Sequence, residues 1–512
     1  MDLGTTATKV IAYDATGVAH ATASESYPLE QPEPGAAVQD PDQIVAAVNR
    51  AVRTVAARLG GRGVAGICLS AAMHSLIGLD RDGVPLTPVI TWADVRAAAQ
   101  ARRLREEGLA LALHHRTGTP VHPMSPLVKL MWLRETQPFL HARAARWVGI
   151  KEYLLLSWCE SFAVDHSVAS AMGLLALATL DWDAQALDLA GVVPEQLPQP
   201  VPTRTRLRGL GASAAREVDL PAGTPVVIGA SDGPLANLGL GAVHPGQVAC
   251  SIGTSGALRV MVEKPAVDPA GGVFCYAFVP DRWVVGGAIN NGGSVLAWAG
   301  DALAPDLGSS ATGLDELVAL AEKAPAGSAG LVMLPYLLGE RAPHWSPLPL
   351  GAYIGMTRAH RREHLVRAAL EGVCFQLSLV LASMRAAGIE IREVRATGGF
   401  ARSALWRQML ADVLGLPVNF PAGYEGSGFG AALLGMQALG LVGSLDVAAD
   451  LVRIESTVRP EPTAAGLYGE LRPVFAGLFD ALLPTFAELR RLAPELAAHT
   501  VPDLPRDSAA LR

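Results

Sequence analysis

The segment Met1-Asp-Leu-Gly-Thr-Thr-Ala-Thr-Lys9 has a counterpart about half the chain later, Ser251-Ile-Gly-Thr-Ser-Gly256. Each segment places a glycine and two hydroxyl residues directly after an apolar residue. Such a turn presents unhindered backbone N–H groups and hydroxyl donors to an anion. One Gly-Thr turn is common hairpin chemistry, but two copies, one in each half, favour a protein that holds the phosphates of one nucleotide. The pair therefore predicts phosphoryl transfer.

The length of the chain favours two domains. Its 512 residues, half of them apolar, exceed what one hydrophobic core usually organises. Short apolar runs alternate with helical patterns, which predicts α/β architecture with sheets covered by helices. Glycines crowd residues 238–246, so we expect a first domain over 1–243, a second over 244–490, and a flexible tail over 491–512.

Composition excludes several classes of protein. The five cysteines are scattered and form no CxxC pair, which argues against a disulfide framework and a structural zinc site. With 41 basic and 48 acidic residues the net charge is −7, and no basic run suggests nucleic acid or a membrane surface as partner. The N-terminus does not read as a signal sequence, and no apolar stretch reaches the roughly 20 residues of a membrane span. We expect a cytoplasmic protein.

Local patterns predict the elements that lead to the candidate site. A hairpin is expected over Leu3–Asp14, and a helix over Asp40–Leu59 that begins at the Asp40-Pro41 cap. The long helix expected over Arg362–Met384 has a helically spaced apolar stripe. Its members are Leu365, Ala369, Phe375 and Leu379. Buried strands are expected over 64–70, 225–229, 248–252 and 393–396, and a further helix over 405–414.

Asp232 follows the strand expected over 225–229, where a carboxylate can project into a cleft. Phosphorylation of an alcohol needs a base within hydrogen-bond reach of the hydroxyl, and an aspartate can accept that proton. Asp2, beside the first Gly-Thr turn, offers a carboxylate to a magnesium ion that bridges phosphates. An ordinary turn and a solvated terminal acid are the alternatives for these two residues.

The residues Gly229-Ala-Ser-Asp-Gly233 also fit the GxSxG nucleophile elbow of α/β-hydrolases, which would make Ser231 a nucleophile. An elbow is followed by a helix, and Pro234, Gly239 and Gly241 predict a poor helix here. No HGGG-type oxyanion segment lies upstream. Hydrolysis is therefore the weaker alternative.

Three further segments carry candidate binding residues. No Walker GxxxxGK[ST] segment and no protein-kinase HRD or DFG occurs, so we expect the Gly398-Gly399 turn to approach the nucleotide. Met73-His74 and Asp94 with Arg96 follow strand-like runs and could contact an acceptor substrate through an imidazole, a carboxylate and a guanidinium. A surface salt bridge and a core histidine are the alternatives.

Together these residues resemble the FGGY family of carbohydrate kinases from Asp2 to about residue 460. The resemblance implies two ribonuclease H-like, actin-type domains with the active site in the cleft between them. It also implies Mg²⁺ and ATP, Asp232 as general base, and Asp2 with Asp232 as metal ligands. The nucleotide-binding residues that it implies are Gly4, Thr5, Thr6, Lys9, Gly253, Thr254, Ser255, Gly398, Gly399 and Phe400.

Within the family the chain looks most like gluconate kinases. The segments that carry this likeness are Ala72-Met-His-Ser75, Thr91-Trp-Ala-Asp-Val-Arg96, Ile150-Lys-Glu-Tyr-Leu154, Asp165-His-Ser-Val-Ala-Ser170 and Leu338-Gly-Glu-Arg-Ala-Pro343. Ser75 replaces the glycine of the Met-His-Gly that xylulokinases tend to carry. D-gluconate is therefore the expected acceptor, bound by Met73, His74, Asp94, Arg96, Lys151 and Asn290, with Arg96 or Lys151 beside its carboxylate. Xylulose or another sugar is the runner-up.

The sequence departs from the family pattern at its start, because Asp2 follows Met1 directly whereas family members carry several apolar strand residues there. Either the true start lies upstream, or the first strand lacks its leading half and the domain is weakened. In the second case we expect a weakly fixed Asp2 and impaired magnesium binding. A non-catalytic ATP-binding module is the corresponding alternative function. The sequence leaves open whether two copies form a homodimer.

Overall fold

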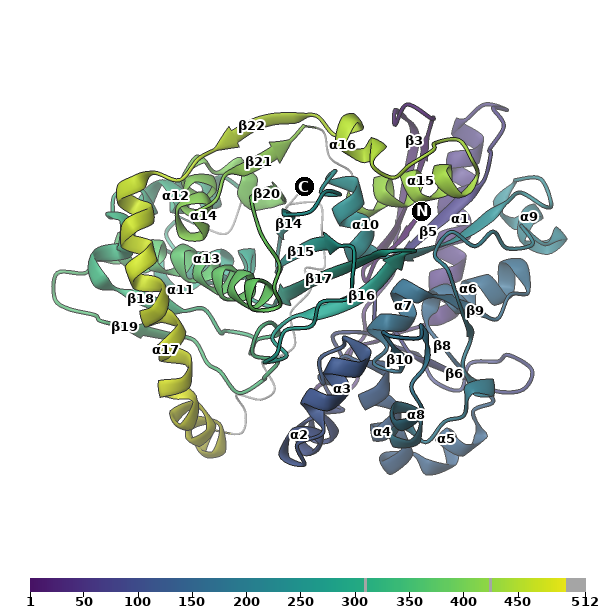
Figure 1. Cartoon of the computed structure of the whole chain (residues 1–512), viewed down its shortest axis with the longest axis horizontal. Helices are drawn as coiled ribbons and strands as arrows, with labels where there is room; N and C mark the ends of the chain where they lie inside the picture. The colour runs from purple at the N-terminus through teal and green to yellow at the C-terminus, as the bar shows by residue number, and fades with distance from the viewer. Residues whose placement is uncertain (308–310, 423–425, 494–512) are drawn as a thin grey trace.

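The computed structural model describes residues 1–307, 311–422 and 426–493, which form two mixed sheets covered by helices (Figure 1). The first sheet has the strand order β13-β5-β1-β2-β3 and the second the order β16-β17-β15-β14-β20-β21-β22. The strands of the first are β1 (Asp2–Leu3), β2 (Ala7–Tyr13), β3 (Ala19–Ser26), β5 (Ile67–Ala71) and β13 (Val226–Ser231). Those of the second are β14 (Gln247–Ile252), β15 (Gly256–Val262), β16 (Phe274–Val279), β17 (Arg282–Ile289), β20 (Glu393–Thr397), β21 (Val418–Pro421) and β22 (Ile454–Val458).

Helices cover both sheets. Those of the first half are α1 (Pro41–Arg58), α2 (Ala98–Glu106), α3 (Ala110–Thr117), α4 (Pro126–Thr136), α5 (Pro138–Arg143), α6 (Ile150–Cys159), α7 (His166–Ala171), α8 (Ala184–Ala190), α9 (Ala212–Val218) and α10 (Asp232–Gly239). Those of the second half are α11 (Gly293–Leu303), α12 (Ala311–Ala321), α13 (Arg362–Ala386), α14 (Ala404–Leu414), α15 (Gly426–Ala438), α16 (Val447–Leu451) and α17 (Pro462–Leu492). Helix α17 therefore includes the first residues of the expected tail, and 494–512 lie outside the described residues.

The parallel strands bring distant segments to one edge of each sheet. Strands β1 and β13 both run parallel to β5, so the first Gly-Thr turn, the segment after β5 and Asp232 follow the same edge. In the second sheet β14 runs parallel to β20, with Ser251 opposite Thr397. The second Gly-Thr turn and the Gly398-Gly399 turn therefore lie side by side. This common edge is where ligands bind in open α/β sheets.

Most of the expected elements are confirmed, with shifted ends. Helix α1 begins where predicted, because the Asp40 carboxylate accepts hydrogen bonds from the backbone N–H groups of Asp42 and Gln43. The expectation of a poor helix after Asp232 is wrong. Pro234 lies in the first turn of α10, where a backbone N–H has no partner within the helix, so a proline is tolerated there.

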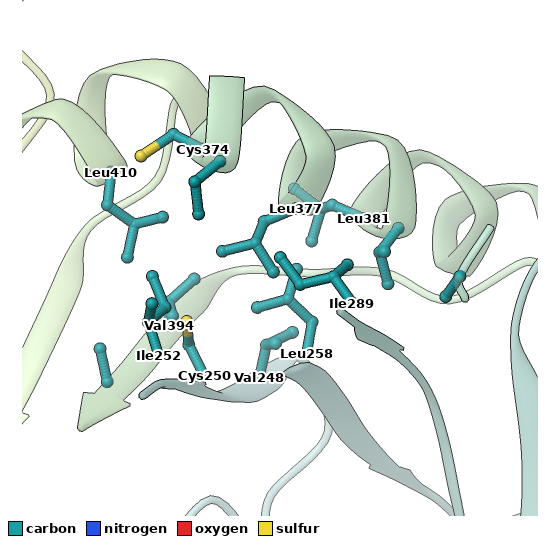
Figure 2. Close-up of a cluster of buried hydrophobic side chains, with 14 of the residues drawn as sticks. Val248, Cys250, Ile252, Leu258, Ile289, Cys374, Leu377, Leu381, Val394 and Leu410 are labelled. Atoms are coloured by element: carbon teal, nitrogen blue, oxygen red, sulfur yellow. The ribbon is translucent and has the colours of Figure 1, made fainter. Parts of the chain in front are cut away.

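The predicted apolar stripe implied that helix α13 is amphipathic, but the structure shows that it is not. It is buried almost all round, because it packs on β15, β17 and β18 (Val332–Leu334) and also on α11, α12, α14 and α17. Figure 2 shows Cys374, Leu377 and Leu381 of α13 above strand residues of the second sheet. Helix α13 is long and apolar enough to span a membrane, but 89% of its apolar window is buried inside the protein. It is a core helix.

The start of the chain is held more firmly than expected. The Met1 amino group donates to the carbonyl oxygen of Cys68 at 3.0 Å. The Asp2 carboxylate accepts hydrogen bonds from the hydroxyls of Ser70 at 2.6 Å and Ser427 at 2.8 Å, so its position is fixed from both halves of the chain. Strand β1 pairs with its neighbours over only two residues, and a cavity of about 450 Å³ lies between β2 and β5 beyond Met1.

Helices α10 and α15 touch through glycines and join the two halves of the chain. A Cβ atom at Gly430 would lie 1.9 Å from the carbonyl oxygen of Leu235, and one at Gly239 would lie 2.2 Å from that of Gly426. Neither distance leaves room for a side chain. Since Asp232 begins α10, this contact also sets the position of its carboxylate.

We expect Gly430→Ala to lower the free energy of unfolding by about 1–3 kcal/mol, because the added methyl group forces the two helices apart. Thermal unfolding measures the change. Gly428→Ala is the matched control in the same helix, since its Cβ would meet only Ile11, at 3.5 Å, and alanine favours a helix over glycine by about 1 kcal/mol. Equal melting temperatures for the two variants would contradict the tight contact.

Candidate active site

Asp232 lies where the two halves meet. It is the first residue of α10, and its Oδ1 accepts a hydrogen bond from the Gly233 N–H at 2.7 Å. Arg259 of β15 comes from the second half, and its Nε would be 2.9 Å from a Cβ at Gly233. Burial raises the pKa of Asp232 to about 6, although the charge of Arg259 opposes the shift. A carboxylate of this pKa can accept a proton at neutral pH.

Asp2 lies near enough to Asp232 for its charge to contribute to the raised pKa of Asp232. Two neighbouring carboxylates beside a Gly-Thr turn suit Mg²⁺, which binds through one or two carboxylates together with substrate phosphates. Within the three described stretches of chain, no three His, Cys, Asp or Glu side chains form a metal-ligand cluster. The residues present therefore fit an ion that takes its remaining ligands from phosphate and water.

The first Gly-Thr turn is fixed by side chains from three segments. The Tyr27 hydroxyl donates to the Gly4 carbonyl oxygen at 2.6 Å, and the Gln39 amide donates to the Thr5 carbonyl oxygen at 2.7 Å. The Trp92 indole N–H donates to the Thr5 hydroxyl at 2.8 Å. Thr6 accepts from the Tyr27 N–H, and Lys9 of β2 lies opposite Asp2 in the β1–β2 pair. The turn is thus rigid before any ligand binds.

The second Gly-Thr turn packs against the start of α11. The Gly293 N–H donates to the Gly253 carbonyl oxygen at 2.6 Å, and the Ser294 N–H donates to that of Thr254 at 3.1 Å. Ser255 closes the turn by accepting from the Gly253 N–H at 2.9 Å. A Cβ atom at Gly253 would meet no atom within 4 Å, so the turn presents open backbone. Open backbone of this kind lets an anion approach closely.

The Gly398-Gly399 turn lies against the second Gly-Thr turn. Gly398 has a φ of 113°, and its Cβ would be 2.2 Å from the Ile252 carbonyl oxygen, so only glycine fits there. Gly399 faces open space. The ring of Phe400 is buried against Trp406 and Phe420, so any contact of this residue with nucleotide would be through its backbone and stays a prediction.

A cavity of about 340 Å³ lies beside the Gly398 turn, at the ends of β20 and β21. Its lining residues are Ala396, Thr397, Gly398, Ala401, Arg407, Phe420, Pro421, Glu455 and Ser456. The Arg407 guanidinium lies 3.9 Å from the centre of the Phe420 ring and braces one wall of the cavity.

The Met73-His74 segment lies beside Asp232. The Met73 methyl group would be 3.0 Å from a Cβ at Gly233. His74 adopts a φ of 69°, and its Nδ1 is 2.7 Å from the Ala171 carbonyl oxygen. Burial and the neighbouring Lys129 charge lower the pKa of His74 to about 3, so the imidazole is neutral. It can exchange hydrogen bonds with a hydroxyl but offers no charge.

Lys129 was not predicted. It lies in α4 and is fully buried, and its ammonium donates to the carbonyl oxygens of His74, Ile90 and Thr91 at 2.6, 3.2 and 2.7 Å. Burial lowers its pKa to about 7. It therefore fixes the two segments that carry Met73 and Trp92. A single lysine within the apolar run 126–133 is the signal that could have revealed it.

Asp94 and Arg96 bind one another. The Arg96 guanidinium donates to both carboxylate oxygens of Asp94, which also accepts from the Ala37 N–H. Arg96 forms a second ion pair with Glu33 and lies over the Trp132 ring at 4.5 Å. Asp94 and Arg96 therefore fit the alternative interpretation, a salt bridge, better than that of two side chains free to contact an acceptor substrate.

Lys151 does not join the site. Its ammonium forms a buried ion pair with Asp165, whose other oxygen accepts from the backbone N–H groups of Ser167 and Val168 at the start of α7. The Ser167 hydroxyl lies 2.6 Å from that of Ser231. Ser231 is thus a fully buried residue bonded to another serine, which contradicts a hydrolase nucleophile.

Asn290 positions an arginine that the sequence did not single out. The Arg341 guanidinium donates to the Asn290 side-chain oxygen at 2.7 Å and to the Ile289 carbonyl oxygen at 3.1 Å, and it lies 4.9 Å from the centre of the Trp92 ring. Glu340 accepts from the Asn290 N–H at 2.6 Å. Its burial raises its pKa to about 7. The Gly-Glu-Arg segment, which resembles that of gluconate kinases, is the sequence signal that could have identified Arg341.

Known proteins match nearly the whole chain. Residues 1–239 match the N-terminal domain, and residues 248–439 the C-terminal domain, of the FGGY family of carbohydrate kinases. A gluconokinase of Bacillus subtilis is 40% identical, in an alignment that covers 93% of this chain and 94% of the relative. A xylulose kinase of Escherichia coli is 31% identical, over 93% and 97%.

Solved structures share the fold. The crystal structure of a gluconate kinase from Lactobacillus acidophilus matches with a TM-score of 0.92 at 34% identity, and the match covers 96% of this chain and 98% of the other. The two family models, the gluconokinase match and the common α/β fold agree, and this chain belongs to the FGGY family of carbohydrate kinases.

Proposed function

We propose that this carbohydrate kinase transfers the γ-phosphoryl group of ATP to D-gluconate and forms 6-phospho-D-gluconate. The observation that carries the chemistry is the buried Asp232 at the start of α10, beside Asp2 and Arg259. The similarity to gluconokinases supports the choice of acceptor. We also propose a cytoplasmic location. Two features support it: the reaction uses ATP, and the five cysteines are free thiols.

In the proposed reaction the primary hydroxyl oxygen of gluconate attacks the γ-phosphorus in line. A new O–P bond forms, the bond from γ-phosphorus to the bridging oxygen breaks, and ADP leaves. Asp232 accepts the hydroxyl proton as the new bond forms. Backbone N–H groups of the two Gly-Thr turns stabilise the charge on the phosphoryl oxygens.

Asp2 and Asp232 are the residues that would hold Mg²⁺. When bound, the ion would neutralise charge on the β- and γ-phosphate oxygens. The hydroxyls of Ser70 and Ser427 orient the Asp2 carboxylate for this role.

The two separate sheets support a division of the chain near residue 243 into two lobes, 1–243 and 244–490. The acceptor and the nucleotide would meet between these lobes. Closure of the lobes would exclude water and limit ATP hydrolysis. Similarity to xylulose kinases makes xylulose the second candidate acceptor.

The acceptor is tested by ADP release from Mg-ATP with D-gluconate, D-xylulose, L-ribulose and glycerol, each offered separately. We expect the highest kcat/KM with D-gluconate. Preference for another acceptor would retain the kinase and refute the gluconate assignment. Nucleotide binding without turnover of any sugar would favour the non-catalytic module.

We expect Asp232→Asn to lower kcat by about 10²- to 10⁴-fold, because the amide cannot accept the proton. Asp82→Asn, in an exposed turn, is the matched control and should keep wild-type kcat. Calorimetric titration with ADP checks that the variant still binds nucleotide. Wild-type kcat in Asp232→Asn would refute its role as base.

The raised pKa of Asp232 predicts an acid limb in the pH profile. Above pH about 6 the group is a carboxylate and can act as base, whereas below that pH it becomes protonated and inactive. We expect kcat/KM for gluconate to fall about tenfold per pH unit below this point. A flat profile down to pH 4.5, with the protein still folded by circular dichroism, would exclude this titration.

A further inference from the structure

The phosphoryl-transfer scheme leaves the Gly-Glu-Arg segment without a role, although Arg341 lies beside the base. The guanidinium donates through Nε to Asn290 and through Nη2 to Ile289. Among the described residues, Nη1 of Arg341 has no hydrogen-bond acceptor. The side chain is therefore fixed in place while one of its amino groups remains available to a ligand.

The surroundings of Arg341 place this amino group with the acceptor. Its guanidinium lies over Trp92, which follows the segment fixed by Lys129. The charges of Glu340, Arg259 and Asp232 all act on it, so it lies within electrostatic reach of Asp232. The Tyr276 hydroxyl, in the field of the same two arginines, is buried and unpartnered within the described part of the chain.

The other candidate cations are already committed. Arg96 is paired with Asp94 and Glu33, Lys151 with Asp165, and Lys129 with three carbonyl oxygens. The charges of Glu340 and Asp232 act on Arg341, but among the described residues neither carboxylate accepts a hydrogen bond from its guanidinium. A guanidinium held in one orientation is the side chain that best recognises a carboxylate.

We propose that Arg341 recognises the carboxylate of an acidic sugar acceptor and so selects an aldonate over a neutral sugar. The inference rests on the proposed function, because it assigns the charged end of the same substrate. Asn290 acts here as a positioning residue, since its side-chain oxygen orients the guanidinium.

The test compares D-gluconate with D-gluconamide, a neutral analogue of similar shape, in steady-state kinetics of the wild type, Arg341→Met and Arg341→Lys. We expect Arg341→Met to lower the ratio of kcat/KM for gluconate over gluconamide by about 10- to 100-fold, mainly through KM for gluconate. Arg341→Lys should recover part of the ratio because it keeps the charge. Arg392→Met, an exposed arginine paired with Glu390, is the control.

Thermal unfolding of each variant establishes that it is folded. An unchanged ratio in folded Arg341→Met would overturn the inference and leave gluconate phosphorylation standing. An equal fall in kcat for both acceptors would place Arg341 at the transferring phosphoryl group and would also overturn it. A wild-type enzyme that phosphorylates a neutral sugar but not gluconate would refute the proposed function itself.

Discussion

Backbone contact between α10 and α15 is the constraint on which the site depends. Gly430 and Gly239 let the helices approach until carbonyl oxygens fill the space of a side chain. Asp232 heads α10, and Ser427 of α15 binds Asp2, so one helix pair holds both carboxylates. A core packed at this density has little freedom to relax around a change in either helix. The acidic pair is therefore held in one geometry by the contact between these two helices.

Buried charges around this pair compensate one another. Asp232 is balanced by Arg259 and Arg341, and burial leaves Glu340 with a pKa of about 7. Burying a lone charge is costly, so each must find a partner or change protonation state. Burial also disfavours the charged form of Arg341 and lowers the pKa of its guanidinium to about 10.

The sequence predicted the parts of the structure that depend on local chemistry. The Asp40-Pro41 cap, the two Gly-Thr turns and Asp232 at a strand end each follow from residues adjacent in the chain. The sequence could not predict which charged residues form ion pairs with one another. Lys151 pairs with Asp165, and Arg96 with Glu33, only after folding. Helix α13 lost its predicted stripe for the same reason, since elements from the whole second half cover it. Lys129 escaped notice because an isolated charge in an apolar segment does not reveal its partners, and Arg341 because the contacts of the Gly-Glu-Arg segment form only on folding.

Lys129 has a consequence for the entropy of sugar binding. Its ammonium binds carbonyl oxygens of the two segments that carry Met73 and Trp92, the proposed acceptor segments. Loops tied in this way are already ordered before a ligand arrives, so binding does not have to restrict their backbone. The sugar then loses mainly its own freedom of motion, and selectivity among sugars depends on fit to a prearranged wall.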